Sequence, residues 1–211
     1  MGDWMARYLD TVGYEVDVAD PVKAESPFRL VDDWESAIDD YDVVVVAVPL
    51  RPSNAVLHRL AELEPRGLVF DIGSLKSPMT SGLEALAAAG CRVCSVHPMF
   101  GPNEVGLSGR HILFVDVGNP AALDEARALF AHTAADCVDL SLAEHDEVMA
   151  WVLGLSHLVK SPSPALWRRA ERRCRCCGRF PVPPSTPSCR SLRRWCPKIR
   201  TCTTRSSRAT R

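Results

Sequence analysis

Residues 43–49 read Val-Val-Val-Val-Ala-Val-Pro, and this stretch decides the fold. A continuous β-branched run is typical of a strand that is buried on both faces of a parallel sheet. The chain that follows predicts a helix at 53–62, with Ser53 as its N-cap, and then a strand at 68–71. The stretch therefore indicates the start of a strand-helix-strand unit.

The same alternation continues in both directions along the chain. The sequence predicts helices at about 2–12, 78–89 and 120–132, and strands at 14–19, 92–96, 112–115 and 137–140. Strands that alternate with helices imply right-handed crossovers and a doubly wound, parallel α/β sheet of the Rossmann-like kind. Ligands of such sheets bind beyond the carboxyl ends of the strands, which here means Asp20 and the ranges 49–53, 73–76 and 97–102.

The beginning of the predicted sheet is incomplete. A dinucleotide-binding fold starts with a strand and a glycine-rich turn, since only glycine lets backbone amides approach the pyrophosphate. Gly2 lies where the third glycine of that turn would open the first helix, so we expect the sheet to lack its first strand. Asp20 has the spacing of an acid that binds the adenosine ribose, which would favour NAD over NADP. Alternatively, Asp20 only begins a turn before Pro21.

The charge of the chain changes abruptly near residue 158. Residues 1–157 contain 25 acidic and 10 basic residues, whereas residues 158–211 contain 1 acidic and 15 basic residues. The acidic part has only two lysines, Lys23 and Lys76. This composition is typical either of a protein that works in high salt or of an ordinary acidic cytosolic enzyme.

Cysteine usage and hydropathy indicate the cellular compartment. Six of the nine cysteines lie in the basic part, and the three in the acidic part show no disulfide-framework spacing. We therefore expect a reducing cytoplasm. No apolar run approaches 20 residues and no signal peptide opens the chain, so we expect a soluble protein without a membrane partner.

Several motifs carry a resemblance to a known family. They are Asp71-Ile72-Gly73-Ser74-Leu75-Lys76, His97-Pro98-Met99-Phe100-Gly101-Pro102 and Glu144-His145-Asp146, the last followed by Leu155-Ser156-His157-Leu158. In this order, over residues 1–159, they resemble the prephenate dehydrogenase family. The resemblance implies an enzyme of tyrosine biosynthesis that converts prephenate, or arogenate, with NAD or NADP as its cofactor.

The chemistry of that family needs a group that takes or polarises a hydroxyl proton while a hydride leaves the same carbon. A neutral imidazole suits this role because its unperturbed pKa lies near working pH. By resemblance the imidazole is that of His97, with Ser74 as its hydrogen-bonding partner near the nicotinamide. Outside the motif at 97–102, a histidine that precedes a proline would be interpreted as an ordinary loop residue.

The resemblance also assigns binding roles and no metal site. Lys76 could equally be a solvent-exposed residue, and His157 a packed interdomain histidine, which is the role that we expect for His145. Asn103 and Glu104 are expected only to shape the loop after His97. The expected cofactor-binding residues are Gly2, Asp20, Pro49 and Ser74, and the expected substrate-binding residues are His157 and Lys76.

After Val159 the chain departs from the family, whose members continue into an all-helical dimerisation domain. Three readings of the basic tail compete: a zinc module, a nucleic-acid-binding arm and a frameshift. The cysteines at 174, 176 and 177 lack zinc-site spacing, and no histidine follows them. GC-rich codons read two nucleotides out of register permit an acidic, cysteine-free, helix-patterned continuation, which favours the frameshift. A basic arm would bind phosphate backbones non-specifically.

We therefore expect three parts: an incomplete NAD(P)-binding domain at 1–140, the start of a helical domain at 141–159, and an out-of-frame, disordered tail at 160–211. The family is homodimeric, but its dimer domain and carboxylate-binding arginine would be missing, so we expect little or no activity, that is, an inactive copy. Nucleic acid is not an expected partner. The alternatives are another NAD-dependent β-hydroxyacid dehydrogenase, and a non-enzymatic binding protein with a basic tail.

Overall fold

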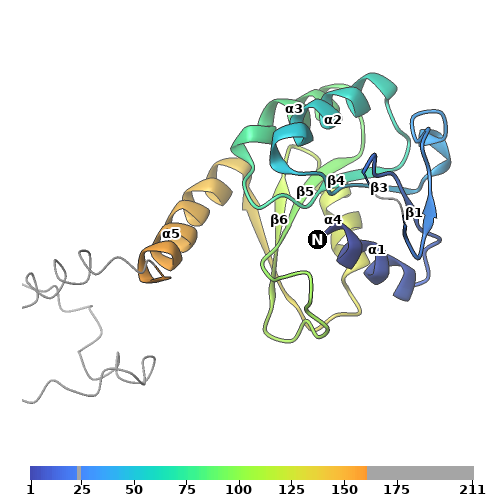
Figure 1. Ribbon diagram of the computed structural model, residues 1–211. Coiled ribbons are helices and arrows are strands. Elements are labelled where there is room, and N and C mark those ends of the chain that lie inside the picture. The colour runs from blue at the N-terminus through green and yellow to red at the C-terminus, as the bar shows by residue number, and fades with distance from the viewer. Residues whose placement is uncertain (23–24, 161–211) are drawn as a thin grey trace, which may run out of the picture. The chain divides into compact units, whose positions relative to one another are not determined.

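The computed structural model describes residues 1–22 and 25–160, with side chains described up to residue 152. Its centre is a five-stranded sheet with the strand order β3-β4-β5-β6-β7 (Figure 1). The strands are β3 (Val43–Val46), β4 (Leu68–Asp71), β5 (Val93–Pro98), β6 (His111–Asp116) and β7 (Asp136–Ser141). The expected strand at 68–71 is confirmed to the residue, and the other four expected strands of this sheet are confirmed with shifted ends.

The sheet is mostly parallel, with one exception. β5 and β6 are antiparallel, with His97 opposite Leu113. The expectation of an entirely parallel sheet is wrong at this pair, because the loop at 99–110 contains no crossover helix and the chain simply reverses direction. The other neighbouring strands run parallel.

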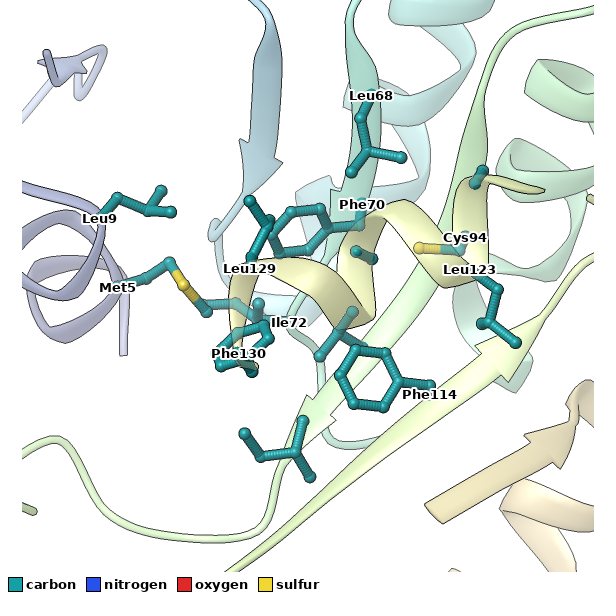
Figure 2. Packing of buried hydrophobic residues seen from close by; sticks show 14 of the residues in the cluster. Met5, Leu9, Leu68, Phe70, Ile72, Cys94, Phe114, Leu123, Leu129 and Phe130 are labelled. Carbon is teal, nitrogen blue, oxygen red and sulfur yellow. The ribbon is translucent and has the colours of Figure 1, made fainter. Parts of the chain in front are cut away.

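Helices cover both faces of the sheet, as the doubly wound prediction requires. Helices α2 (Leu50–Leu63) and α3 (Thr80–Ala88) lie on one face, and α1 (Gly2–Thr11) and α4 (Pro120–Leu129) on the other (Figure 1). The side chains of β4 alternate accordingly. Leu68 and Phe70 pack with Met5 of α1 in one core cluster (Figure 2), whereas Val69 packs with Leu57 of α2 in the other.

The segment after α1 is less regular than predicted. The strand expected at 14–19 is only β1 (Asp17–Val18), and it pairs in parallel with β2 (Arg29–Leu30) in a separate two-stranded sheet. β3 lies at the edge of the five-stranded sheet. The expectation that a first strand is missing stays a prediction.

Two helix starts differ from expectation. Ser53 is not an N-cap: α2 begins at Leu50 after Pro49, and the Ser53 hydroxyl donates back to the carbonyl oxygens of Val48 (3.2 Å) and Pro49 (3.0 Å). A proline at position 49 can precede the helix because no amide is needed there. The helix expected at 78–89 opens as a 3-10 turn, η2 (Ser77–Met79).

The last described element is helix α5 (Leu142–Lys160). Within the described ranges, no helix is both long enough and apolar enough to cross a membrane. The side chain of His157 and the tail after Lys160 lie outside the described residues. A short 3-10 helix, η1 (Ile38–Asp40), precedes β3 and completes the set of helices in this part of the chain.

Candidate active site

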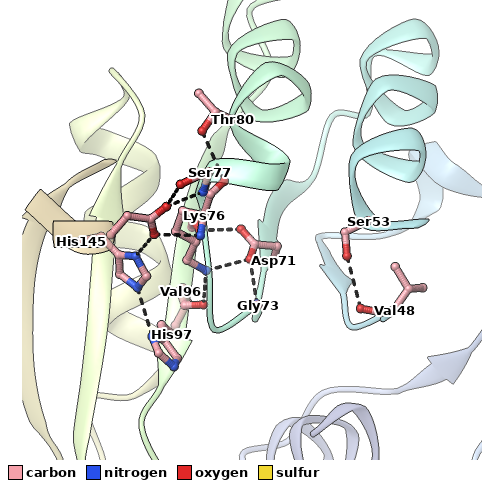
Figure 3. Close-up of polar contacts among 12 residues, drawn as sticks. Val48, Ser53, Asp71, Gly73, Lys76, Ser77, Thr80, Val96, His97 and His145 are labelled. Atoms are coloured by element: carbon pink, nitrogen blue, oxygen red, sulfur yellow. Dashed lines mark hydrogen bonds and ion pairs between the residues drawn. The ribbon is translucent and has the colours of Figure 1, made fainter. Parts of the chain in front are cut away.

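The candidate site is built around His97, which lies near the carboxyl end of β5. The residue is 6% exposed, and its Nδ1 lies 3.0 Å from Nε2 of His145 on α5 (Figure 3). Nδ1 of His97 is therefore held by His145, whereas Nε2 has no hydrogen-bond partner among the described residues.

The expected partner of His97 is corrected by this geometry. Ser74 is exposed and makes no hydrogen bond to His97 in the structure. The inner side of the imidazole is occupied instead by His145, because the first turn of α5 packs its ring against β5. Sequence reasoning expected His145 only as a packed histidine and so missed this contact.

His145 is held in turn by Asp146. The Nδ1 atom of His145 lies 2.8 Å from Oδ1 of Asp146. Burial alone would raise the pKa of Asp146, but hydrogen bonds from Ser77, the Lys76 amide and His145 lower it well below its usual range. Asp146 is therefore a carboxylate at neutral pH.

The same carboxylate ties α5 to the loop after β4. Asp146 accepts the backbone amides of Lys76 (3.0 Å) and Ser77 (2.6 Å), and also the Ser77 hydroxyl. Both oxygens of Asp146 thus accept hydrogen bonds from residues 76–77, about 70 residues earlier in the chain. The Glu144-His145-Asp146 motif marked this position, but its local pattern could not reveal the partner.

Lys76 and Asp71 form a buried ion pair beside these histidines. The Lys76 Nζ atom donates to Oδ2 of Asp71 (2.7 Å) and to the carbonyl oxygen of Val96 (2.9 Å). Ser95 donates its hydroxyl to the other Asp71 oxygen, and the Gly73 amide donates to Oδ2. Burial lowers the pKa of Lys76, while Asp71 raises it.

The position of Lys76 decides between its two readings. The side chain is 0% exposed, so the reading as a solvent-exposed residue is wrong. Its substrate contact stays a prediction, and it would require the ion pair with Asp71 to open. In the structure Lys76 fastens the loop after β4 to the neighbouring strand β5.

The charge state of His97 follows from its surroundings. Burial, together with Lys76 and His145, lowers the pKa of His97 to about 3, although Asp146 opposes them. Burial also lowers the pKa of His145. Both imidazoles are therefore neutral at pH 7, and a neutral imidazole can accept a proton.

Two of the residues expected at the cofactor, Gly2 and Pro49, lie close to the carboxyl end of β3. A Cβ added to Gly2 would lie 3.2 Å from the Cβ of Ala47, so the start of α1 meets the chain directly after β3. Pro49 follows as the residue before α2. Asp20 is exposed after β1, and its Oδ1 accepts the Val22 amide (2.9 Å), as the turn reading predicted.

The start of α1 is chemically suited to a phosphate group. The first-turn amides of a helix have no partners within the helix and carry positive partial charge, which favours a phosphate. Because Gly2 and Ala47 are both small residues, the start of α1 lies close to the carboxyl end of β3. No group of three or more His, Cys, Asp or Glu side chains in the described part of the chain could hold a metal ion.

Comparisons with known proteins agree with the motifs. Residues 9–117 match the family described as "Prephenate dehydrogenase, nucleotide-binding domain". A protein of Methanocaldococcus jannaschii named "Probable arogenate/prephenate dehydrogenase" is 27% identical over 168 residues, covering 74% of this chain and 38% of that protein. The T-protein of Enterobacter agglomerans is 27% identical over 160 residues, covering 74% and 40%. The chain thus spans about two fifths of these relatives.

Solved structures share the fold. The prephenate dehydrogenase of Aquifex aeolicus in complex with hydroxyphenyl propionate and NAD+ has a TM-score of 0.57 at 19% identity, covering 78% of this chain and 68% of that one. An imine reductase of Myxococcus stipitatus in complex with NADP+ has a TM-score of 0.59 at 19% identity, covering 75% and 61%. The second match shows that this fold alone does not identify a substrate.

Proposed function

Because the chain belongs to the prephenate dehydrogenase family through its nucleotide-binding domain, we propose that it serves the oxidative decarboxylation of prephenate to 4-hydroxyphenylpyruvate with NAD. The observation that carries the proposal is the imidazole of His97, neutral at pH 7, with Nδ1 bonded to His145 and Nε2 without a partner among the described residues. That arrangement fits a general base at the rim of the sheet.

In this reaction the substrate loses a hydroxyl proton and a hydride from the same ring carbon. We assign the proton to Nε2 of His97. The electron pair of the O–H bond forms a ring carbonyl as the hydride leaves, and the bond to the ring carboxylate then breaks to release carbon dioxide. That electron pair aromatises the ring, and His97 returns the proton to the phenolate oxygen, so no net proton is released.

NAD, when bound, supplies the hydride acceptor. Gly2, at the start of α1, would receive the pyrophosphate at the helix N-terminus, with Pro49 beside it. Asp20 would accept the ribose hydroxyls and disfavour a 2′-phosphate, which makes NAD the proposed cofactor and NADP the alternative. The exposed hydroxyl of Ser74 would lie near both the nicotinamide and the substrate.

Prephenate is the proposed small-molecule partner, with arogenate as the related alternative. His157 and Lys76 are the proposed substrate-binding residues beyond Ser74. A homodimer, in which the family's helical domain takes part, and a cytoplasmic location also belong to the proposal. The three described cysteines are free thiols, which supports a reducing compartment.

The test is prephenate-dependent formation of NADH by the purified chain. We expect a turnover below the ordinary range of about 1 to 1,000 per second, because the sequence after residue 160 departs from the family. The signal should vanish in His97→Asn and persist in His132→Asn, a variant of an exposed histidine. Oxidation of a β-hydroxyacid in place of prephenate, or equal signals from both variants, would overturn the proposal.

A further inference from the structure

A continuous chain of hydrogen bonds leads from Asp146 through His145 to His97. Its two steps measure 2.8 Å, from Oδ1 of Asp146 to Nδ1 of His145, and 3.0 Å, from Nε2 of His145 to Nδ1 of His97 (Figure 3). His145 is fully buried. The chain of bonds therefore runs through the protein interior and ends at the ring of His97, whose Nε2 has no partner among the described residues.

The direction of each bond follows from the carboxylate. Asp146 is ionised and can only accept hydrogen bonds, and the amides of Lys76 and Ser77 already donate to it. Nδ1 of His145 must therefore carry a hydrogen and donate to Oδ1. In a neutral imidazole only one nitrogen carries a hydrogen, so Nε2 of His145 is an acceptor.

The same reasoning reaches His97. Because Nε2 of His145 accepts, Nδ1 of His97 must carry the hydrogen that is shared between the two rings. Nε2 of His97, which has no partner among the described residues, then carries the lone pair of the ring. The opposite tautomer would place the lone pair of His145 Nδ1 against a carboxylate oxygen at 2.8 Å, an unfavourable contact.

We propose that Asp146 is a positioning residue that acts through His145 to fix His97 in the Nδ1–H tautomer, leaving Nε2 as the proton acceptor. The assignment of the proton donor as prephenate rests on the function proposed above. The tautomer of His97 follows from the hydrogen bonds alone, so it can be tested independently of the proposed reaction.

Asp146 also stabilises the charge that appears when His97 takes up a proton. The charged and titratable groups that shift the pKa of His97 are Lys76, His145 and Asp146, and only Asp146 raises it. The carboxylate thus counteracts the buried ammonium of Lys76 at the moment of proton transfer. In addition, its bonds to the amides of Lys76 and Ser77 hold α5 in the position that orients His145.

Long-range proton–nitrogen NMR spectra of the full chain, labelled with ¹⁵N in its six histidines, test the tautomer directly. We expect His97 and His145 each to show a protonated Nδ1 and an unprotonated Nε2 at pH 7. Assignment comes from the missing signals of His97→Gln and His145→Gln. A hydrogen on Nε2 of His97 in the unaltered chain would overturn the proposal whatever the variants do.

Two variants then test the role of Asp146. Asp146→Asn removes the charge and leaves one oxygen where two were bonded, so the Nδ1–H population of His97 should fall. With prephenate and NAD, kcat should drop by about 10²- to 10⁴-fold with little change in KM. The control is Glu144→Gln, in the same turn of α5, which bonds Ser141 and lies outside the chain of bonds.

The two proposals fail in distinguishable ways. If NADH formation depends on prephenate and His97 while the His97 spectra of Asp146→Asn and Glu144→Gln are the same, the role of Asp146 is wrong and the reaction stands. If the tautomers are as expected but prephenate is not oxidised, the reaction is wrong. His145→Phe provides an independent check, because without its acceptor His97 should shift towards the Nε2–H form.

Discussion

The Nζ atom of Lys76 lies 2.7 Å from Oδ2 of Asp71, and neither side chain is more than 1% exposed. A buried ion pair of this kind is costly to break, because the remaining charge has no partner. Lys76 follows β4 in the loop that also carries Ser77, whereas Asp71 ends the strand itself. The pair thus fixes the loop that meets Asp146 and, through it, the histidines.

Removal of the ammonium should therefore destabilise the fold. Lys76→Met leaves the Asp71 carboxylate buried and unpaired, and we expect the free energy of unfolding to fall by about 3–5 kcal/mol. Urea denaturation measures this change. As a control, Arg59→Met removes an exposed cation that pairs with Glu35 and Glu62, and stability should hardly change. Equal effects of the two variants would contradict the account.

The close approach of the chain at Gly67 gives a second prediction. A Cβ at this position would lie 2.2 Å from the backbone oxygen of Tyr41, which cannot rotate away as a side chain could. Gly67→Ala should therefore displace the start of β4 and lower the free energy of unfolding by about 1–3 kcal/mol. Gly106→Ala, where nothing lies within 4 Å, is the matched control and should be tolerated. Thermal unfolding compares the two.

Stability should depend on pH through His97. Its folded pKa of about 3 lies below the ordinary value of 6.5, so unfolding takes up a proton in acid. The contribution is fully present above about pH 6.5 and is lost as the pH falls towards 3, at up to about 1.4 kcal/mol per pH unit. Lys76, His145 and Asp146 surround the ring, so His145 should add to the same slope.

The measurement is urea unfolding at several pH values between about 4 and 8. This range spans the ordinary pKa of histidine. His97→Gln should flatten the decline below pH 6.5 relative to the unaltered chain. The exposed His132, changed to Gln, should leave the decline as it is. A variant of His97 with an unchanged slope would show that the ring is not buried in its neutral form.

Cofactor preference should depend on Asp20. Asp20→Ser removes the carboxylate proposed to bind the ribose, and we expect NAD affinity to fall about tenfold, equivalent to about 1.4 kcal/mol, while NADP affinity rises. Fluorescence titration with each dinucleotide measures the ratio. Asp10→Ser, on the exposed side of α1, serves as the control. If Asp20 only caps its turn, the substitution will change the affinities for NAD and NADP equally.

Much of the fold follows from local patterns in the chain. The apolar spacing of α1 requires a buried surface, and the structure supplies it. The run at 43–48 predicts a strand buried on both faces, and this is wrong: β3 is an edge strand, and of its four valines only Val46 is fully buried. The antiparallel pairing of β5 with β6 was not predicted, although the missing helix in the loop at 99–110 is the physical reason for it. Periodicity identifies elements but does not report their direction.

The site was predictable only in part. His97 follows from its motif, because that motif ends a strand at the functional edge of the sheet. Its partner His145 lies 48 residues away, and Asp146 meets Lys76 across 70 residues, so these contacts depend on where α5 packs. The burial of Lys76 likewise depends on Asp71 and on the carbonyl of Val96 from a neighbouring strand.

The central claim is that His97 takes the hydroxyl proton while the hydrogen on the same ring carbon leaves as a hydride. Prephenate that carries deuterium on that carbon, incubated with the full chain and NAD, tests it through the mass of the reduced cofactor. The account predicts that the deuterium appears in NADH and that His97→Asn lowers its transfer by about 10²-fold or more. Prephenate-dependent formation of NADH without deuterium, or transfer undiminished in His97→Asn, would contradict it.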